Sequence, residues 1–156
     1  MNTDQEPINS IFSGKHDKLT DAVIRVFHDV YNELGPGFLE SVYHMALTLA
    51  LRQAGMHVES QVPVPVYFRG HIVGEFRADL VINEAVLLEL KASQALDRNH
   101  ETQVLNYLHA TPLEVAALLN FGPKPQLRRF VLDNSRKKIR VHPCSSVVSY
   151  QSEVDA

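Results

Sequence analysis

The chain has a single cysteine, no apolar stretch long enough to cross a membrane, and no surplus of positive charge. Cys144 alone can form neither an internal disulfide nor a cysteine-based zinc site, which favours a reducing, cytoplasmic setting. The polar N-terminus lacks the apolar segment of a signal peptide, so we expect a protein with no membrane attachment. The formal net charge of −3 excludes a global basic field, and any surface for nucleic acid must be local.

Length and composition are those of one ordinary soluble domain. The chain has 156 residues, of which 45% are hydrophobic and 21% charged, and this is enough to bury a real core. No internal repeat is present. We expect residues 1–16 to form a flexible N-terminal segment, residues 17–143 a single domain, and residues 144–156 a polar C-terminal tail.

The hydrophobic periodicity predicts two helices, a run of strands, a third helix and further strands. Thr20 is expected to cap the first helix, the turn at 35–37 to end it, and Gly55 to end the second. Pro63 and Pro65 place the first strand at a sheet edge. The expected helices span residues 20–34, 38–54 and 98–110, and the expected strands span residues 62–68, 72–76, 78–82, 86–91, 115–121, 127–132 and 138–141. This order predicts an α/β fold in which helices flank a mixed sheet.

Three charged side chains, Asp79, Glu89 and Lys91, interrupt the apolar hairpin at 78–91. A three-residue turn at 83–85 puts Asp79 opposite Glu89 and leaves the other face wholly apolar, whereas a two-residue turn would separate the acids. Charged groups are seldom buried unless they are paired or bind an ion, so this set indicates a divalent cation and an activated water. The alternative is an ordinary hairpin with one solvated polar face.

The second and third helices supply further candidates. Glu40 opens the second helix after a tight turn, and Tyr43 and His44 follow it on the same face. Its alternative role is to complement the helix dipole. Gln103 and Tyr107 share a stripe of the third helix, where an uncharged amide could hold a water or a phosphate. The alternative for this pair is a helix surface beside a half-buried aromatic ring.

These residues also carry a resemblance. The segment Gly37-Phe-Leu-Glu40-Ser-Val-Tyr43 matches the pattern that names the GxxExxY protein family, which is part of the PD-(D/E)xK nuclease superfamily. The order Glu40, Asp79, Glu89-Leu-Lys91 and Gln103-x3-Tyr107 resembles the active-site order of that superfamily. The stretch Asn120-Phe-Gly122 followed by Arg128-Arg129 also looks like the GxxExxY family. The likeness covers roughly residues 17 to 135. Ala78 stands where the superfamily motif has a proline, a position that varies among its members.

The resemblance implies a restriction-endonuclease-like core and phosphodiester cleavage that depends on Mg²⁺, with Mn²⁺ as a substitute. Its implied metal ligands are Asp79, Glu89, the main-chain carbonyl of Leu90, and Glu40 through water or at a second metal position. Lys91 is implied to position or deprotonate the attacking water. Gln103 is implied to orient the nucleophile or the phosphate, with Tyr43 and Tyr107 in support.

Nucleic acid, and DNA in particular, is the expected partner, and a homodimer the expected assembly. The densest basic segment could follow a phosphate backbone, although a solvated surface explains it equally well. Its residues are Arg128, Arg129, Arg136, Lys137, Lys138 and Arg140, with Arg77 and Arg98 nearer the acids. A nuclease-like fold kept as a binding module and hydrolysis of another phosphate ester stay open as alternatives.

Overall fold

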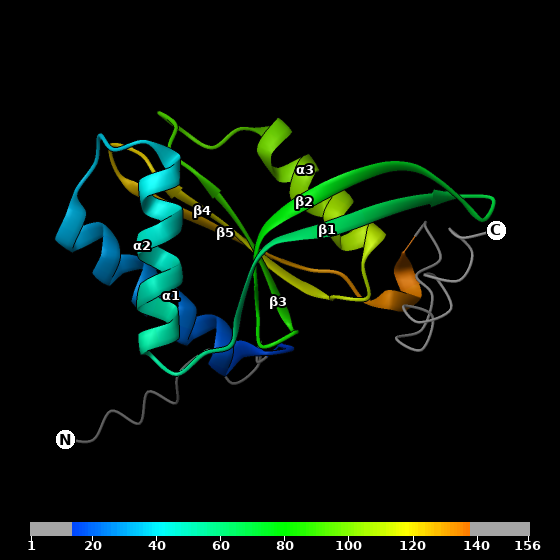
Figure 1. Ribbon diagram of the computed structural model, residues 1–156, viewed down its shortest axis with the longest axis horizontal. Coiled ribbons are helices and arrows are strands. Elements are labelled where there is room, and N and C mark those ends of the chain that lie inside the picture. The colour runs from blue at the N-terminus through cyan, green and yellow to red at the C-terminus, as the bar shows by residue number, and fades with distance from the viewer. Residues whose placement is uncertain (1–13, 138–156) are drawn as a thin grey trace, which may run out of the picture.

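The computed structural model describes residues 14–137, which form three α-helices and a five-stranded sheet (Figure 1). The elements in chain order are α1 (Asp17–Leu34), α2 (Glu40–Gln53), β1 (Val58–Phe68), β2 (His71–Ile82), β3 (Val86–Lys91), α3 (Arg98–Ala110), β4 (Val115–Phe121), β5 (Pro125–Val131) and a short 3-10 helix (Asn134–Arg136). The strands lie in the order β1-β2-β3-β4-β5. Only β3 and β4 run parallel, because α3 connects them, so the sheet is mixed as predicted.

Both faces of the sheet are covered. Helices α1 and α2 pack on one face, where Phe27, Tyr43 and Leu47 meet the alternating apolar side chains of the strands. Helix α3 packs on the other face through Val104 and Leu108. Strand β4 is buried along its whole length, as its unbroken apolar run predicts. The fold is thus an α/β sandwich with two helices below the sheet and one above it.

The hairpin of β2 and β3 has the predicted register. Val81 lies opposite Leu87, and the connecting turn occupies residues 83–85, with Asn83 and Glu84 at positive φ. The side chains of Leu80, Ile82, Val86, Leu88 and Leu90 join the core under α1 and α2, while those of Val81, Leu87 and Ala78 join the core under α3. The prediction of two separate faces is therefore confirmed, and the polar end of the second face lies beneath α3.

Strand β1 is an edge strand, as Pro63 and Pro65 predict. It begins at Val58, four residues before the predicted start. The two strands expected at 72–76 and 78–82 are one continuous strand, β2, because β1 pairs with it from end to end. The paired strands extend beyond the rest of the sheet as a long arm (Figure 1). The strand expected at 138–141 lies outside the described residues.

Thr20 is not the N-cap of α1, and that prediction is wrong. The helix begins at Asp17 after His16, and the buried Thr20 hydroxyl donates to the His16 carbonyl one turn earlier. A threonine can make this bond inside a helix as readily as it can cap one. The ends at Gly35 and Gly55 are confirmed, since each has positive φ and donates its N–H to a carbonyl of the preceding turn. None of the helices within residues 14–137 has the length and apolar character needed to span a membrane.

Candidate functional site

Asp79 lies where β2 parts from β3. The residue pairs of the ladder between these strands end at Leu80 and Leu88, so the next residue of each strand is released from the regular ladder. The carboxylate of Asp79 uses this opening: its Oδ2 accepts the main-chain N–H of Leu90 at 2.7 Å. This bond turns the side chain toward β3, beside Glu89. The sequence prediction that Asp79 and Glu89 meet thus has a local structural cause.

Glu89 is the most strongly perturbed acid of the site. Its side chain is only 5% exposed, and its Oε2 has no hydrogen-bond partner among the described residues. The pKa of Glu89 is raised to about 8, chiefly by burial and in addition by the nearby charge of Asp79. Burial also raises the pKa of Asp79, against the opposing effect of the Leu90 N–H. A buried carboxylate and a half-buried one that disfavour each other's charge form a site suited to a cation.

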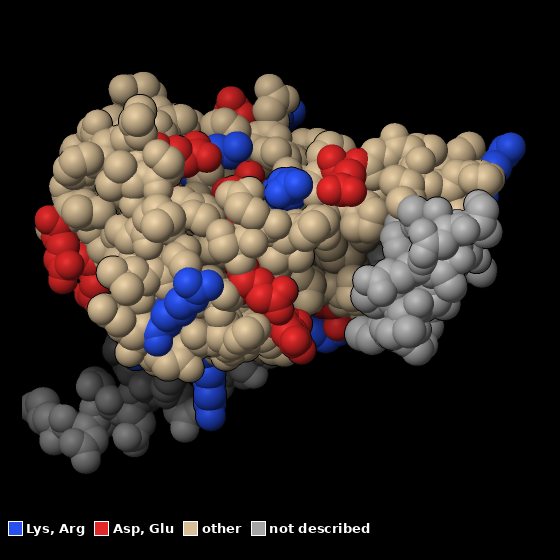
Figure 2. All heavy atoms as spheres, in the orientation of Figure 1, with Lys and Arg blue, Asp and Glu red and all other residues tan. Residues whose placement is uncertain are grey.

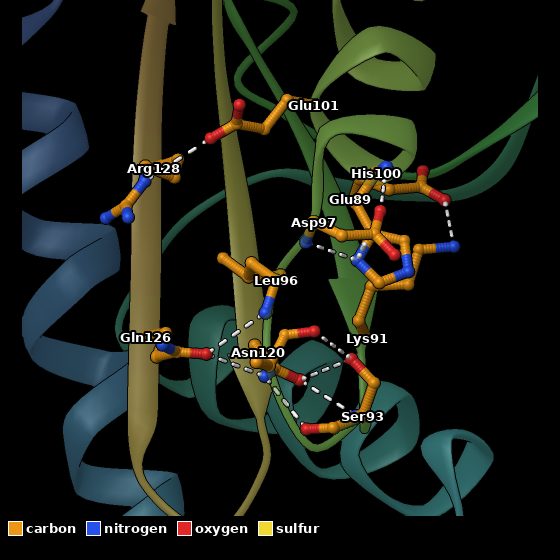
Figure 3. Close-up of polar contacts among 11 residues, drawn as sticks. Glu89, Lys91, Ser93, Leu96, Asp97, His100, Glu101, Asn120, Gln126 and Arg128 are labelled. Carbon is orange, nitrogen blue, oxygen red and sulfur yellow. Dashed lines mark hydrogen bonds and ion pairs between the residues drawn. The ribbon is translucent and has the colours of Figure 1, made fainter.

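Lys91 supplies the compensating positive charge. Its Nζ lies 3.6 Å from Oε1 of Glu89, and its side chain is 20% exposed. Figure 3 shows the two side chains directed toward each other beside the start of α3. The ammonium lowers the pKa of Glu40, Asp79 and Glu89 alike, so it acts on all three acids. The alternative of a surface ion pair on a solvated face does not fit, because Glu89 is buried.

Glu40 joins the site from the other side of the sheet, at the first position of α2. Loss of hydration raises its pKa, and the charge of Asp79 adds to that rise, whereas the charge of Lys91 and the main chain of Ala92 oppose it. Glu40 nevertheless remains exposed to solvent. Within residues 14–137, no three His, Cys, Asp or Glu side chains form a group able to hold a metal ion. Asp79 and Glu89 are therefore the close pair, and Glu40 acts on them from farther out.

Tyr43 and His44 contact the main chain next to Glu40 and Asp79. Tyr43 is fully buried, and its hydroxyl donates to the Gly35 carbonyl at 2.5 Å and accepts the Phe38 N–H at 3.2 Å. These bonds fix the turn from which Glu40 emerges. His44 places Nε2 3.2 Å from the main-chain oxygen of Asp79. Tyr43 thus positions Glu40, and His44 holds strand β2, which carries Asp79.

Helix α3 brings Gln103 and Tyr107 to the same region. Asp97 caps the helix by accepting the His100 N–H at 3.0 Å, and the His100 ring accepts the Asp97 N–H in return. One turn later, Nε2 of Gln103 donates to the Tyr107 hydroxyl at 2.9 Å. Burial raises the pKa of Tyr107, and the charge of Glu89 raises it further. The tyrosine is therefore close to the acids, and the predicted pairing on one stripe is confirmed.

Sequence comparison assigns this arrangement to a known group. A family model described as the PD-(D/E)XK nuclease superfamily matches residues 17–130, which is most of the chain. The chain belongs to the PD-(D/E)XK nuclease superfamily. Among solved structures, the crystal structure of SSO0001 is similar at 17% sequence identity and a TM-score of 0.49, over 72% of this chain. This chain covers 55% of that one. A search of curated proteins finds no match.

The hydrogen-bond network around Asn120 was not predicted as part of the site. Asn120 is fully buried in the otherwise apolar β4, and its amide pairs with the main chain of Ser93: Oδ1 accepts the N–H at 2.9 Å and Nδ2 donates to the carbonyl at 3.0 Å. Gln126 extends the network by accepting from Asn120 and from the Leu96 N–H, both at 3.2 Å (Figure 3). The network fixes the loop between Lys91 and α3. A lone amide inside an apolar strand was the available signal.

The basic residues expected to contact nucleic acid are used differently. Arg129 donates to the Lys15 carbonyl and pairs with Asp17, and the Lys137 ammonium donates to two main-chain carbonyls. Burial lowers the pKa of Lys137 to about 8. Arg128 pairs with Glu101 but stays 58% exposed. Arg77 and Arg98 are exposed, and Lys138 lies outside the described residues. On the face of the molecule drawn in Figure 2, Lys and Arg side chains lie scattered among Asp and Glu side chains and do not gather into one basic patch. A proposed nucleic-acid surface therefore rests on Arg77, Arg98 and Arg128.

Proposed function

We propose that the protein is a metal-dependent nuclease that hydrolyses phosphodiester bonds in DNA. The observation that carries the proposal is the buried Glu89 beside the half-buried Asp79, with the Lys91 ammonium 3.6 Å from the Glu89 carboxylate. Membership of the nuclease superfamily supports it. Within that superfamily we place the chain in the GxxExxY family, on the match at residues 37–43. The single cysteine keeps the cytoplasm as our expected compartment.

The residues present fit a hard divalent cation. Glu89 has a buried oxygen with no partner among the described residues, and Asp79 adds a second carboxylate beside it. Burying an unpaired carboxylate is costly, so such an oxygen favours an ion that completes it. Asp79, Glu89 and the Leu90 carbonyl would hold Mg²⁺ or Mn²⁺, with Glu40 reaching it through water. The bound ion would polarise the phosphate and promote ionisation of a water.

The other residues would act on substrate and water. The Lys91 ammonium is placed to donate to a phosphate oxygen and to offset the charge that develops during cleavage. Gln103, held by Tyr107, would orient the attacking water or the phosphate with its amide. Tyr43 and His44 are positioning residues, because they contact the main chain that presents Glu40 and Asp79.

A second function also has an observation in its favour. The described residues provide no preformed site of three acids, and two of the expected DNA-binding cations are bound within the protein. These features suit a nuclease-like fold that binds nucleic acid or protein without cleaving it. The two proposals differ in one measurable property, which is turnover.

A cleavage assay with Asp79→Asn separates them. We expect the parent protein to cleave at least one of linear, nicked, branched or single-stranded DNA, or RNA, in Mg²⁺ or Mn²⁺. Asp79→Asn removes a ligand charge and is expected to lower the rate at least about 100-fold, or roughly 2.7 kcal/mol of barrier. Asp29→Asn, on the exposed surface of α1, is the matched control and should cleave like the parent.

Two outcomes of this assay would contradict the nuclease proposal. Cleavage that survives Asp79→Asn would place the chemistry elsewhere and contradict the proposal. Calorimetric metal binding without cleavage of any substrate would favour the binding module.

Glu40→Gln should weaken cleavage more than it lowers the free energy of unfolding. Equal losses of activity and stability would mean that Glu40 acts only at the end of the helix.

We also propose a homodimer formed through α2. The outer side of this helix exposes four large apolar side chains in successive turns: Leu39, Val42, Met45 and Leu49. Beside them lies a groove of about 750 Å³, lined in part by Met45 and Leu49. A projecting apolar row next to a groove can pack against its own copy about a two-fold axis, and apolar patches of this kind mark interaction sites.

Light scattering after size exclusion measures this assembly. The parent protein is expected to run with twice the mass of one chain, and Met45→Glu to run as a monomer, because each interface would then bury two unpaired carboxylates. Val131→Glu, at an exposed apolar position of β5, is the control and should leave the mass unchanged. A monomeric parent, or a dimer that tolerates Met45→Glu, would exclude this interface.

A further inference from the structure

A second pocket lies directly beside the acids and is not used in the proposed chemistry. It has a volume of about 600 Å³ and is lined by three short segments, residues 36–38, 92–94 and 121–123. The first segment ends two residues before Glu40, and the second begins immediately after Lys91. The pocket therefore adjoins two of the three chain segments that carry the charged groups of the candidate site.

The lining of this pocket contains no ionisable side chain. A phosphate subsite would need cations or a row of converging N–H groups, and charged side chains are absent from all nine lining positions. What the walls offer is apolar surface, main-chain polar groups and the amide of Gln94. This combination suits an uncharged, planar, polar-edged group, and in a nucleic acid that group is the base.

The aromatic wall is built rigidly. Phe38 is 48% exposed, and its ring meets Tyr43 edge-on with centroids 6.0 Å apart. Tyr43 in turn stacks on Phe121 at 4.4 Å, and its hydroxyl accepts the Phe38 N–H. An exposed phenylalanine would normally be mobile, but these contacts hold its backbone and one ring edge. A solvent-exposed ring fixed in this way is ready to stack.

The opposite wall allows a close approach because of Gly122. A Cβ at this position would lie 2.2 Å from the Ser93 carbonyl oxygen, so no other residue fits without moving the loop. The hydroxyl of Tyr31 donates to the carbonyls of Gly122 and Pro123, at 2.8 Å each. The amide of Asn120 holds Ser93 from the strand side. The main chain on this side is thus immobilised in a shape that leaves the pocket open.

We propose that this pocket accepts one unpaired nucleobase of the substrate, next to the scissile phosphate and stacked on Phe38. The inference rests on the proposed nuclease function and extends it, because it assigns the substrate class: nucleic acid with an unpaired nucleotide at the cleavage position. A base within a duplex cannot enter such a pocket unless it leaves the stack. Single strands, flaps, loops and mismatched sites would be bound in preference to intact duplex.

The absence of tryptophan in the sequence makes a direct test possible. Phe38→Trp keeps an aromatic face in the pocket and introduces the only indole of the chain. Its emission is followed while single-stranded oligonucleotides are added in EDTA, which prevents cleavage. We expect quenching by an intact oligonucleotide, and loss of that quenching with a strand of the same length in which every nucleotide is abasic. Val73→Trp, at a position of β2 that is 62% exposed and outside the lining, should respond equally to both oligonucleotides.

Affinity gives a second reading. Phe38→Leu retains apolar volume without a ring face, and it is expected to weaken binding of a single-stranded oligonucleotide about 5- to 150-fold, the range measured for loss of one stacked base. The same variant should bind intact duplex as the parent does. Equal quenching by intact and abasic strands, or parental affinity in Phe38→Leu, would overturn the proposal.

The two proposals fail separately. Base-dependent quenching without cleavage of any substrate would retain the pocket and reject the nuclease. Cleavage of single strands by Phe38→Leu at the parental KM would retain the nuclease and reject the pocket. A raised KM with an unchanged kcat would support both.

Discussion

Glu89→Gln is expected to stabilise the metal-free protein at pH 8 while abolishing its metal binding. Burial raises the pKa of Glu89 to about 8, above the ordinary value of 4.5 that applies in the unfolded chain. For a raised carboxyl pKa, the stability contributed by the protonated form is present below about pH 4.5 and is lost as pH rises toward 8. The free energy of unfolding should therefore fall by about 2 to 3 kcal/mol between pH 5 and pH 7. Glutamine has no proton to lose and should remove this fall.

Urea denaturation in EDTA at pH 5, 6, 7 and 8 measures the effect. Glu84→Gln changes an exposed glutamate in the turn of the same hairpin, and it should keep the parental dependence on pH. Asp79 contributes in the same direction, because its pKa is also raised by burial. A parental pH dependence that persists in Glu89→Gln would mean that Glu89 is not the group that titrates.

Metal binding by the parent should show the reverse dependence. A cation can bind the Glu89 carboxylate only after its proton leaves, so Mn²⁺ affinity is expected to rise by up to about tenfold per pH unit between pH 6 and 8. Calorimetry in two buffers of different ionisation enthalpy would report the released proton. Glu89→Gln should show neither binding nor proton release, and its cleavage rate should fall at least about 100-fold. Binding that is independent of pH would place the cation away from Glu89.

The sequence predicted the centre of the site because local rules determine it. The turn at 83–85 sets the register of the hairpin, and the requirement for one unbroken apolar face allows a single solution. Asp79 and Glu89 are then brought together by strand geometry alone. The pairing of Gln103 with Tyr107 follows in the same way from helical spacing. These contacts depend on short stretches of chain, which is why they were predictable.

The supporting contacts were not predictable, because they join segments far apart in the sequence. His44 reaches the Asp79 carbonyl across 35 positions, and Asn120 reaches Ser93 across 27. Tyr43 follows Glu40 by three residues in α2, yet its ring is fully buried and stacks on Phe121, which lies far away in the sequence. The pattern of one helix or strand does not indicate which distant backbone group a polar side chain will satisfy.

Contacts with distant segments also explain why the basic residues at 128 and 129 behave differently from each other. Arg128 and Arg129 are neighbours in the sequence with identical side chains, yet they point to opposite faces of β5. One lies 58% exposed beside α3, and the other is tied to Lys15 and Asp17 near the start of α1. Charge density along the sequence therefore overstated the surface that is open to a phosphate backbone. Of the exposed cations that remain, Arg98 begins α3 and Arg128 pairs with Glu101 of that helix, so these two lie on the side of the sheet that α3 covers.

Lys91→Met is expected to lower the cleavage rate at least about 100-fold, and to move the onset of metal binding to higher pH. Methionine keeps most of the apolar stem and removes the charge. Because the Lys91 charge lowers the pKa of Glu89, Asp79 and Glu40, its loss should raise the pKa of Glu89 above 8. Protons then compete with the cation up to a higher pH. The free energy of unfolding of the metal-free variant should also go on falling to a higher pH than that of the parent, because the fall ends only when the pH passes the folded-state pKa of Glu89.

Mn²⁺ titrations between pH 6 and 9, together with cleavage rates at saturating Mn²⁺, separate the two roles of Lys91. Lys18→Met, at an exposed position of α1, is the control and should behave as the parent in both measurements. If saturating Mn²⁺ restores the parental rate, Lys91 serves only to keep the acids ionised, and its proposed contact with the phosphate is wrong. If the rate stays low at saturation, the ammonium acts on the reacting groups themselves. An unshifted binding profile would instead contradict the electrostatic link between Lys91 and Glu89, which the 3.6 Å separation of their charged atoms supports.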